Sequence, residues 1–286
     1  MQTKFTVADF KKSKVENRKI TVLTAYDYPT AKIMDEAGID CILVGDSLGM
    51  VVLGYEDTTK VTMDDMIHHI KAVARGTKTA FVIGDMPFLS YHTGRYESVR
   101  NAGRLIAEGG CGAVKLEGGE AIADDVRSII SAGIPVMGHL GYTPQSINLF
   151  GGHKAQGKSI ETARKIMHDA LCLQEAGVFS IVLECIPHAL AKLITSRLDI
   201  PTIGIGAGPD CDGQVLVYHD VFGMYKGQPH KHAKKYFDMA EKIDEVVRNY
   251  ANEIRDGIFP TTQNSFIMDD SIVKQLEREF AAGGIK

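Results

Sequence analysis

The chain has 286 residues, 44% of them hydrophobic, and a formal net charge of −4. This length and apolar content suit one large domain with a substantial core, and the slightly acidic balance offers no basic surface for nucleic acid. No apolar run reaches the roughly 18 residues of a membrane span, and residues 1–19 lack the apolar core of a signal peptide, so we expect neither.

The five cysteines are odd in number and form no CxxC pair. Three of them lie in or beside apolar runs, where cysteine usually behaves as a small buried hydrophobe. This usage is typical of a reducing compartment, and we expect a cytoplasmic protein.

Short apolar runs alternate with helical patterns along most of the chain. A short helix over Val7–Lys14 comes first. The apolar runs then predict eight strands: Ile20–Ala25, Cys41–Gly45, Ala80–Gly84, Ala113–Glu117, Pro135–Gly138, Phe179–Glu184, Thr202–Gly206 and Gln214–Val217. Several runs show no alternation of apolar and polar residues, as expected of strands buried on both faces of a parallel sheet.

Helical patterns fill most intervals between these strands. They cover Thr30–Ala37, Met63–Arg75, Arg95–Glu108, Ala121–Ser131, Ser159–Ala176 and Pro187–Leu198. All but the last precede a glycine, a frequent helix terminator. The repeated strand–helix order with eight strands predicts an α/β fold, the (β/α)8 TIM barrel. A doubly wound open sheet is the alternative, but it would use fewer strands.

Two further helical patterns, His232–Ile254 and Ser271–Phe280, predict a C-terminal helical extension. We expect one barrel domain over 1–286, with a tail over about 267–286. The long segments Leu48–Val61 and Leu140–Lys158 follow strands two and five. They should overhang the catalytic face as mobile lids.

Four of the predicted strands end on or next to a carboxylate: Asp46, Asp85, Glu117 and Glu184. The carboxyl ends of parallel strands line the active site of α/β proteins, so these side chains should meet. Oxygen ligands suit Mg²⁺, and no His/Cys cluster has zinc spacing in the sequence. We therefore expect a metal at Asp46 and Asp85, joined by Glu117. The alternative for each aspartate is to cap the following helix.

Lys115 shares a strand face with Glu117 by alternation. A buried lysine there can anchor a substrate carboxylate, act as a Schiff-base nucleophile or form a structural ion pair; the neighbouring metal site favours the anchor. Glu184 is the candidate general base. Its alternative role is a charge at the start of the helix near Pro187.

His139 follows strand five in Met137–Leu140. A histidine at a strand end can exchange protons, contact substrate or serve a purely structural role. Ser47, next to Asp46, offers a hydroxyl and a backbone N–H that can bind an anion.

Seven stretches that contain or flank these residues closely resemble the 3-methyl-2-oxobutanoate hydroxymethyltransferase (ketopantoate hydroxymethyltransferase) family. They are Thr24–Tyr28, Leu43–Met50, Gly84–Phe88, Val114–Glu120, Gly138–Ser146, Val182–Cys185 and Ile203–Gly208. The resemblance extends from about Thr6 to Phe266.

This resemblance implies a Mg²⁺-dependent barrel, with one Mg²⁺ per subunit, that transfers a hydroxymethyl group from 5,10-methylenetetrahydrofolate to 3-methyl-2-oxobutanoate. The product would be 2-dehydropantoate, formed by Mg-stabilised enolate chemistry in pantothenate (coenzyme A precursor) biosynthesis. A cytoplasmic homodecamer is typical of bacterial members. We therefore expect a keto acid, folate and other copies of the chain as partners, but neither nucleic acid nor membrane.

The resemblance also implies roles for single residues. Asp46 and Asp85 would hold the metal, Glu117 would lie in or next to its coordination shell, and Glu184 would accept the proton. Together with the reading of the strand ends, it predicts a substrate-binding set that comprises Asp46, Ser47, Asp85, Lys115 and His139.

Two other functions compete with this one. A Mg²⁺-dependent C–C lyase or mutase of the phosphoenolpyruvate mutase/isocitrate lyase type shares the carboxylates and the enolate chemistry. Such enzymes typically carry a catalytic cysteine in a loop, and Leu140–Lys158 has none. A non-catalytic metabolite-binding or assembly barrel would predict damaged site residues, whereas this set is intact.

Overall fold

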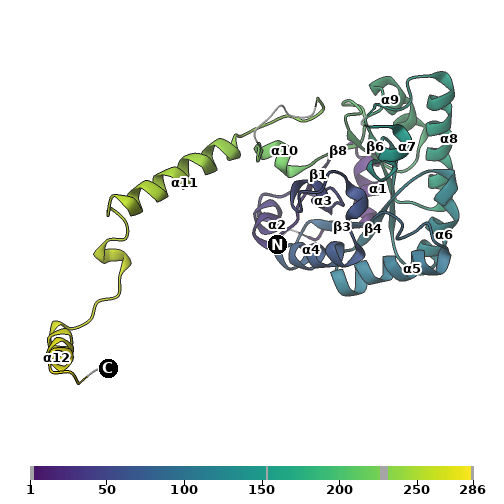
Figure 1. Ribbon diagram of the computed structural model, residues 1–286. Helices are drawn as coiled ribbons and strands as arrows, with labels where there is room; N and C mark the ends of the chain where they lie inside the picture. Colours follow the sequence, from purple (N-terminus) through teal and green to yellow (C-terminus); the bar gives the residue numbers. More distant parts are fainter. Residues whose placement is uncertain (1–2, 153, 226–230, 285–286) are drawn as a thin grey trace. The chain divides into compact units, whose positions relative to one another are not determined.

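Eight parallel strands close into a barrel in the computed structural model, which describes residues 3–152, 154–225 and 231–284 (Figure 1). The strands are β1 (Ile20–Thr24), β2 (Cys41–Val44), β3 (Phe81–Asp85), β4 (Ala113–Glu117), β5 (Val136–Gly141), β6 (Ser180–Glu184), β7 (Thr202–Ile205) and β8 (Gly213–Leu216). Each strand pairs with the next, and β8 pairs with β1. The predicted (β/α)8 barrel is confirmed. An open sheet is excluded because every strand is paired on both sides.

One strand extends clearly beyond its predicted bounds. β5 continues to Gly141 instead of ending at Gly138, because His139 pairs with Glu117 of β4 and Gly141 pairs with Glu184 of β6. His139 therefore belongs to the sheet and not to the loop that follows it. The other strand bounds differ from the predicted ones by at most one residue.

Helices surround the barrel (Figure 1). They are α1 (Val7–Val15), α2 (Tyr28–Glu36), α3 (Leu48–Val51), α4 (Met63–Gly76), α5 (Arg95–Arg104), α6 (Ala123–Ser131), α7 (Ile147–Phe150), α8 (Ile160–Ala176), α9 (His188–Arg197) and α10 (Tyr218–Phe222). Of these, α2 contacts α4, α5 contacts α6, α6 contacts α8 and α8 contacts α9. The predicted helix Arg95–Glu108 divides into α5 and a π-helical turn, η2 (Leu105–Gly109). Among the described residues, no helix combines the length and the hydropathy that a membrane crossing requires.

Side-chain caps set where several helices begin. The α2 helix begins at Tyr28 instead of Thr30, because the Asp27 carboxylate accepts the Thr30 amide at 2.8 Å and caps the helix. At the start of α4, the Thr62 hydroxyl accepts the Asp65 amide at 3.1 Å. The Asp65 carboxylate in turn accepts the Thr62 amide at 2.9 Å, which completes a capping box.

The amino-terminal end of the barrel is closed by α1. Phe10 of this helix is fully buried and belongs to the same core as the inward-facing residues of the strands. Its ring packs edge-to-face on Phe179 at 5.0 Å and on Phe81 at 6.1 Å, measured between ring centroids. The aromatic group fills the barrel below the strand ends, which leaves the carboxyl end as the functional face.

Asp35 connects α2 to the entry of β3. Its buried carboxylate accepts the backbone amides of Lys78, Thr79 and Ala80 at 3.0, 2.8 and 2.7 Å. Burial opposes ionisation of Asp35, but these hydrogen bonds outweigh it, and the pKa of the carboxyl lies below its usual value. The charge therefore stabilises the fold.

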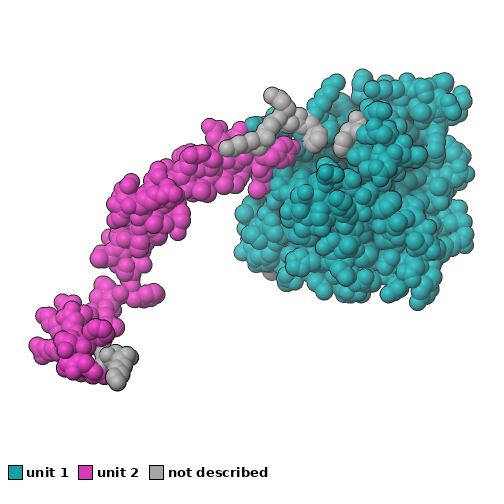
Figure 2. Space-filling view, in the orientation of Figure 1, with its two compact units in different colours: residues 1–223, 227–237 teal, residues 224–226, 238–286 magenta. Residues whose placement is uncertain are grey.

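The chain divides into two compact units (Figure 2). Unit 1, residues 1–223 and 227–237, contains the barrel. Unit 2, residues 224–226 and 238–286, contains α11 (Met239–Arg255) and α12 (Asp270–Ala281), and neither helix has a buried side chain among the described residues. The prediction of one domain over 1–286 with a tail over about 267–286 stays a prediction.

The predicted helix His232–Ile254 is wrong at its start. The helix begins at Met239, because the Asp238 carboxylate accepts the Glu241 amide at 3.3 Å and caps it. Before the cap, the Tyr236 amide donates to the Val221 carbonyl at 2.8 Å, which holds this segment beside α10 in a non-helical conformation. The second predicted helix corresponds to α12.

Candidate active site

The carboxyl ends of β2 to β6 bring the predicted side chains to one end of the barrel. Asp46 and Ser47 follow β2, and the others lie on β3, β4, β5 and β6, namely Asp85, Lys115, Glu117, His139 and Glu184. All of them are buried except Ser47 and Glu184, which are partly exposed. Side chains from distant parts of the sequence therefore form one cluster.

Two aspartates and a lysine lie at the centre of this cluster. The Asp46 amide donates to Asp85 Oδ2 at 3.1 Å, and Lys115 Nζ lies 3.0 Å from Asp85 Oδ1. Gly45 permits this close approach, since a Cβ there would lie 2.8 Å from Ser47 Oγ and 3.3 Å from Asp85 Oδ2. Neither aspartate caps a helix, because Ser47 and Gly94 occupy the N-cap positions of α3 and α5. The capping alternative is therefore wrong.

The charges of this cluster do not balance. Burial and the charges of Asp85 and Glu117 raise the pKa of Asp46 well above its usual value. Burial also raises the pKa of Asp85, although Lys115 opposes it. Three buried carboxylates, those of Asp46, Asp85 and Glu117, thus outnumber the cationic groups beside them, the Lys115 ammonium and the His139 ring. Asp85 Oδ1 accepts no hydrogen bond of acceptable geometry among the described residues. A divalent cation held by oxygen atoms fits this environment.

Lys115 stays protonated in this environment. Burial favours the neutral amine, but the carboxylates of Asp85, Glu117 and Asp46 outweigh it and raise the pKa of Lys115 above its usual value. A Schiff-base nucleophile must be a neutral amine at the moment of attack. The electrostatics therefore favour the anchor role over the nucleophile role.

His139 connects the two sides of the cluster. Its Nε2 lies 3.2 Å from Glu184 Oε2, and its Nδ1 lies 3.3 Å from Glu117 Oε1 and 3.4 Å from Lys115 Nζ. Burial and the Lys115 charge lower the basicity of the ring, but the carboxylates of Glu117 and Glu184 beside its two nitrogens prevail and raise the pKa of His139 to about 9. The ring is therefore an imidazolium at neutral pH.

Glu184 lies at the more open side of the cluster. Its side chain is 16% exposed, against 4% for Asp85 and 5% for Glu117. The α9 helix is capped by Pro187 without a side-chain hydrogen bond. Glu184 is thus directed to His139, and a molecule entering the barrel mouth can reach it.

Ser47 faces Tyr26, which follows the neighbouring strand β1. Its Oγ lies 2.8 Å from the Tyr26 hydroxyl oxygen. The Tyr26 ring in turn lies against the rings of Tyr218 and His219, with centroids 5.7 and 5.6 Å away. Burial raises the pKa of Tyr26 above its usual value, so the hydroxyl keeps its proton and can donate to Ser47.

Gln145 and Tyr91, which connect the acidic side chains, were not among the predicted site residues. Gln145 Nε2 donates to Asp46 Oδ2 at 2.8 Å, and the Gln145 amide donates to Glu117 Oε2 at 3.0 Å. The buried Tyr91 hydroxyl donates to Gln145 Oε1 at 2.7 Å and accepts the Glu117 amide at 3.1 Å. These bonds fix the orientation of Asp46 and Glu117. A neutral glutamine in a loop gave no motif, although it lies within one of the family-like stretches.

Both long segments after β2 and β5 contain short helical turns. The first, Leu48–Val61, contains α3 and η1 (Thr58–Lys60), and the second, Leu140–Lys158, contains η4 (Pro144–Ser146) and α7. The η1 turn contacts η4. Their role as mobile lids stays a prediction, and His153 in the second segment lies outside the described residues.

A cavity of about 250 Å³ opens beside the acidic cluster. It is lined by Phe88, Leu89, Tyr91, His92, Glu117, Gln145 and Ser146. Aromatic and apolar side chains form part of this lining, and Glu117 and Gln145 belong to the cluster itself. Such a combination of apolar surface and a few convergent polar groups is typical of a small-molecule site.

Relatives of known kind cover nearly the whole chain. Residues 4–262 match the model of a family described as "Ketopantoate hydroxymethyltransferase". A 3-methyl-2-oxobutanoate hydroxymethyltransferase of Acetivibrio thermocellus is 68% identical over 278 residues, which are 97% of this chain and 98% of that protein. One from Enterococcus faecalis is 54% identical over 273 residues, 96% of this chain and 99% of that protein.

Solved structures with the same fold are more distant in sequence. A phosphonopyruvate hydrolase superposes with a TM-score of 0.61 at 13% identity and covers 97% of both chains. A 2,3-dimethylmalate lyase, described as a member of the PEP mutase/isocitrate lyase superfamily, has a TM-score of 0.57 at 14% identity, again over 97% of both chains. At this identity the likeness shows the fold alone.

Proposed function

The chain belongs to the ketopantoate hydroxymethyltransferase family and is an enzyme that transfers a hydroxymethyl group to 3-methyl-2-oxobutanoate in pantothenate biosynthesis, and we propose that its strand-end side chains do so as a Mg²⁺-dependent catalyst. The observation that carries the proposal is the buried charge imbalance, in which the three carboxylates of Asp46, Asp85 and Glu117 outnumber the two cationic groups beside them, Lys115 and His139. An oxygen-rich site with excess negative charge is suited to Mg²⁺.

Asp46 and Asp85 would hold the ion, with Glu117 in or next to its coordination shell. The ordering of these carboxylates by Gln145 and Tyr91 supports this division, because ligands are generally oriented by hydrogen bonds behind them. Bound Mg²⁺ would supply Lewis acidity toward the oxygens of the keto acid.

Lys115 and Ser47 would orient the substrate. The Lys115 ammonium, kept charged by its neighbours, is suited to the carboxylate of 3-methyl-2-oxobutanoate. Ser47 adds a hydroxyl whose direction is limited by Tyr26, 2.8 Å away. Two contacts at separate points fix how the substrate lies relative to the base.

Glu184 would accept the C3 proton of the keto acid. Its partly exposed carboxylate is open to the barrel mouth, and His139 supports it from behind at 3.2 Å. A carbon that has lost this proton can attack the one-carbon unit of a donor. In this account His139 contacts both the base and Glu117, so it positions the base relative to the substrate site.

The one-carbon donor would be 5,10-methylenetetrahydrofolate, and family membership supports this assignment. The same membership supports a cytoplasmic homodecamer, for which sedimentation of the full chain is the direct test. Function as a C–C lyase finds no support in the distant structural relatives, because their likeness shows the fold alone.

Turnover with and without metal tests the proposed function. Purified protein should form tetrahydrofolate from 3-methyl-2-oxobutanoate and methylenetetrahydrofolate when Mg²⁺ is present. EDTA should abolish the reaction, and added Mg²⁺ should restore it. Undiminished turnover in EDTA would contradict the metal assignment, and no turnover by folded protein in Mg²⁺ would favour a non-catalytic barrel.

A further inference from the structure

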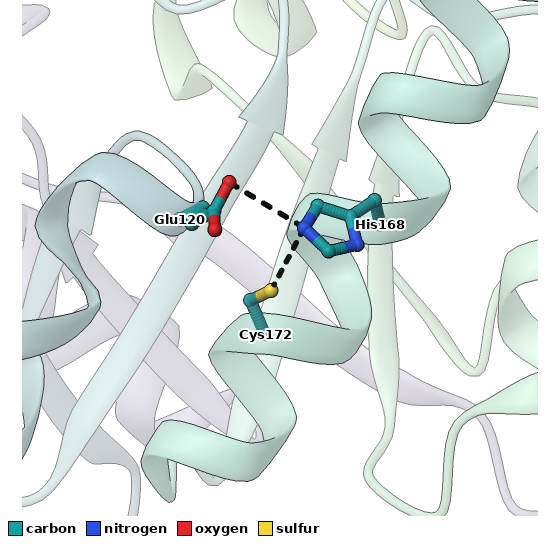
Figure 3. A group of neighbouring side chains, drawn as sticks. All are labelled: Glu120, His168 and Cys172. Carbon is teal, nitrogen blue, oxygen red and sulfur yellow. Dashed lines mark hydrogen bonds and ion pairs between the residues drawn. The ribbon is translucent and has the colours of Figure 1, made fainter.

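A second group of potential metal ligands lies on the outside of the barrel (Figure 3). Glu120 begins the turn η3 (Glu120–Ile122), shortly after β4 ends. His168 and Cys172 lie four residues apart on α8 and therefore project from the same helix face. Figure 3 shows the carboxylate, the imidazole and the thiol pointing toward one another. None of the three belongs to the site described above.

The donor atoms are separated by distances that a metal ion requires. His168 Nε2 lies 3.4 Å from Glu120 Oε2 and 3.4 Å from Cys172 Sγ, and no two of the three donor atoms are more than 4.8 Å apart. Tetrahedral coordination with bonds of about 2.0–2.1 Å to N or O and about 2.3 Å to S places ligand atoms roughly 3.3–3.6 Å apart. The distances from His168 Nε2 to Glu120 Oε2 and to Cys172 Sγ therefore already match those between ligand atoms that share one metal ion.

The main chain that carries Glu120 is fixed to the helix that carries the other two ligands. The buried Asp169 carboxylate accepts the Glu120 amide at 3.0 Å and is paired with Lys165 Nζ at 2.9 Å. Gly119 allows this contact, since a Cβ there would lie 2.1 Å from Asp169 Cγ. Adjusting the ligands to an ion therefore requires only side-chain rotation.

The local field favours a cation. The carboxylates of Glu120, Glu175 and Asp169 lie near the Cys172 thiol, with Arg127 as an opposing charge. These carboxylates attract a metal ion. The side chains of Glu120 and His168 are 66% and 58% exposed, so an ion can enter from solvent.

We propose that Glu120, His168 and Cys172 bind one divalent transition-metal ion, with Zn²⁺ the best match, and that water completes the coordination. The mixed S, N and O donors suit Zn²⁺ or Co²⁺, whereas Mg²⁺ prefers oxygen alone. Binding displaces the thiol proton of Cys172 to solvent, because the ligand is the thiolate. The ion would join the turn after β4 to α8 and is distinct from the Mg²⁺ of the active site.

Co²⁺ absorption tests the proposal, because sulfur-to-cobalt charge transfer requires a thiolate ligand and the acidic cluster contains none. The untagged full-length protein is stripped with EDTA, supplied with excess Mg²⁺ and titrated with Co²⁺. We expect a near-ultraviolet charge-transfer band that saturates at one Co²⁺ per subunit and is displaced by Zn²⁺. Absence of the band in folded protein would overturn the proposal.

Variants assign the band to its ligands. Cys172→Ser should abolish it, and His168→Gln should weaken Co²⁺ binding by more than the roughly 10-fold cost of losing a supporting hydrogen bond. Cys185→Ser is the matched control, because Cys185 is also partly buried and lies 3.8 Å from a histidine, His232. A band that survives Cys172→Ser but disappears in Cys185→Ser would refute the assignment. Circular dichroism verifies that each variant is folded.

Discussion

His139 Nε2 lies 3.2 Å from Glu184 Oε2, while Nδ1 of the same ring lies 3.3 Å from Glu117 Oε1. The histidine thus spans the distance between the carboxylate proposed as the base and a carboxylate at the proposed metal site. Because β5 continues through His139 to Gly141, the ring is held by the sheet between β4 and β6. The relative position of base and metal is therefore fixed by three adjacent strands.

Replacement of His139 should misplace the carboxylate of Glu184, the proposed base. We expect His139→Asn to lower kcat by about 100-fold, the size of effect that a small misplacement of a reacting group produces. The keto acid should bind nearly as well as before, because Lys115 remains protonated without the imidazolium nearby. Steady-state kinetics measure kcat and KM separately. A large rise in KM with unchanged kcat would instead make His139 a substrate-binding residue.

Gln145 should support turnover by strengthening the binding of Mg²⁺. Gln145→Ala removes the donor to Asp46 Oδ2, and we expect it to weaken Mg²⁺ binding by about 10- to 100-fold. Turnover measured against Mg²⁺ concentration should therefore shift to higher Mg²⁺ and recover largely at saturation. Gln275→Ala, which changes an exposed glutamine of α12, is the control. Loss of activity that saturating Mg²⁺ does not restore would show a different role.

Asp46 should destabilise the protein that lacks metal. Burial and the neighbouring Asp85 and Glu117 raise the pKa of Asp46, so its ionised form opposes folding. Asp46→Asn should therefore increase the free energy of unfolding in EDTA. It should also abolish turnover and the stabilisation by Mg²⁺. Thermal unfolding with and without Mg²⁺ measures this, with the exposed Asp199→Asn as control. A less stable metal-free variant would refute the argument.

In contrast to Asp46, the ionised form of Asp35 should stabilise the fold. Its pKa is below the usual 3.8, so the ionised form is favoured by folding. Asp35→Asn should cost about 1–3 kcal/mol at neutral pH, because the asparagine keeps only one acceptor oxygen and turns a donor NH2 group toward a backbone amide that had donated to the carboxylate. The deficit should stay constant above the usual pKa and shrink as pH falls below 3.8 through the lower folded value. Urea unfolding over a pH series measures it, and a deficit independent of pH would contradict this role.

The strands and the charged strand ends could be predicted because their signals are local. Each apolar run before Asp46, Asp85, Glu117 and Glu184 is buried on both faces, so composition alone marks the strand and its end. The barrel then follows from the strand count, and the hydroxymethyltransferase prediction is confirmed by relatives of 54–68% identity.

The supporting residues could not be predicted in the same way. Gln145 reaches Asp46 only because the segment after β5 folds back over the strand ends, and Tyr91 reaches Gln145 from the loop after β3. Both contacts join residues far apart in the sequence through uncharged side chains. The start of α11 was missed for a related reason, since the hydrogen bond from Tyr236 to Val221 overrides the helical pattern before Met239.

Exchange of the C3 hydrogen of 3-methyl-2-oxobutanoate with deuterium tests the proposed base most directly. The reaction is followed by NMR in Mg²⁺ without folate, so only proton removal is observed. Glu184→Gln should lower exchange by about 100-fold or more, the usual contribution of a positioned base, while Mg²⁺ and keto-acid binding persist. Glu161→Gln, on the exposed first turn of α8, should exchange normally. Undiminished exchange in Glu184→Gln would remove Glu184 from the role of base.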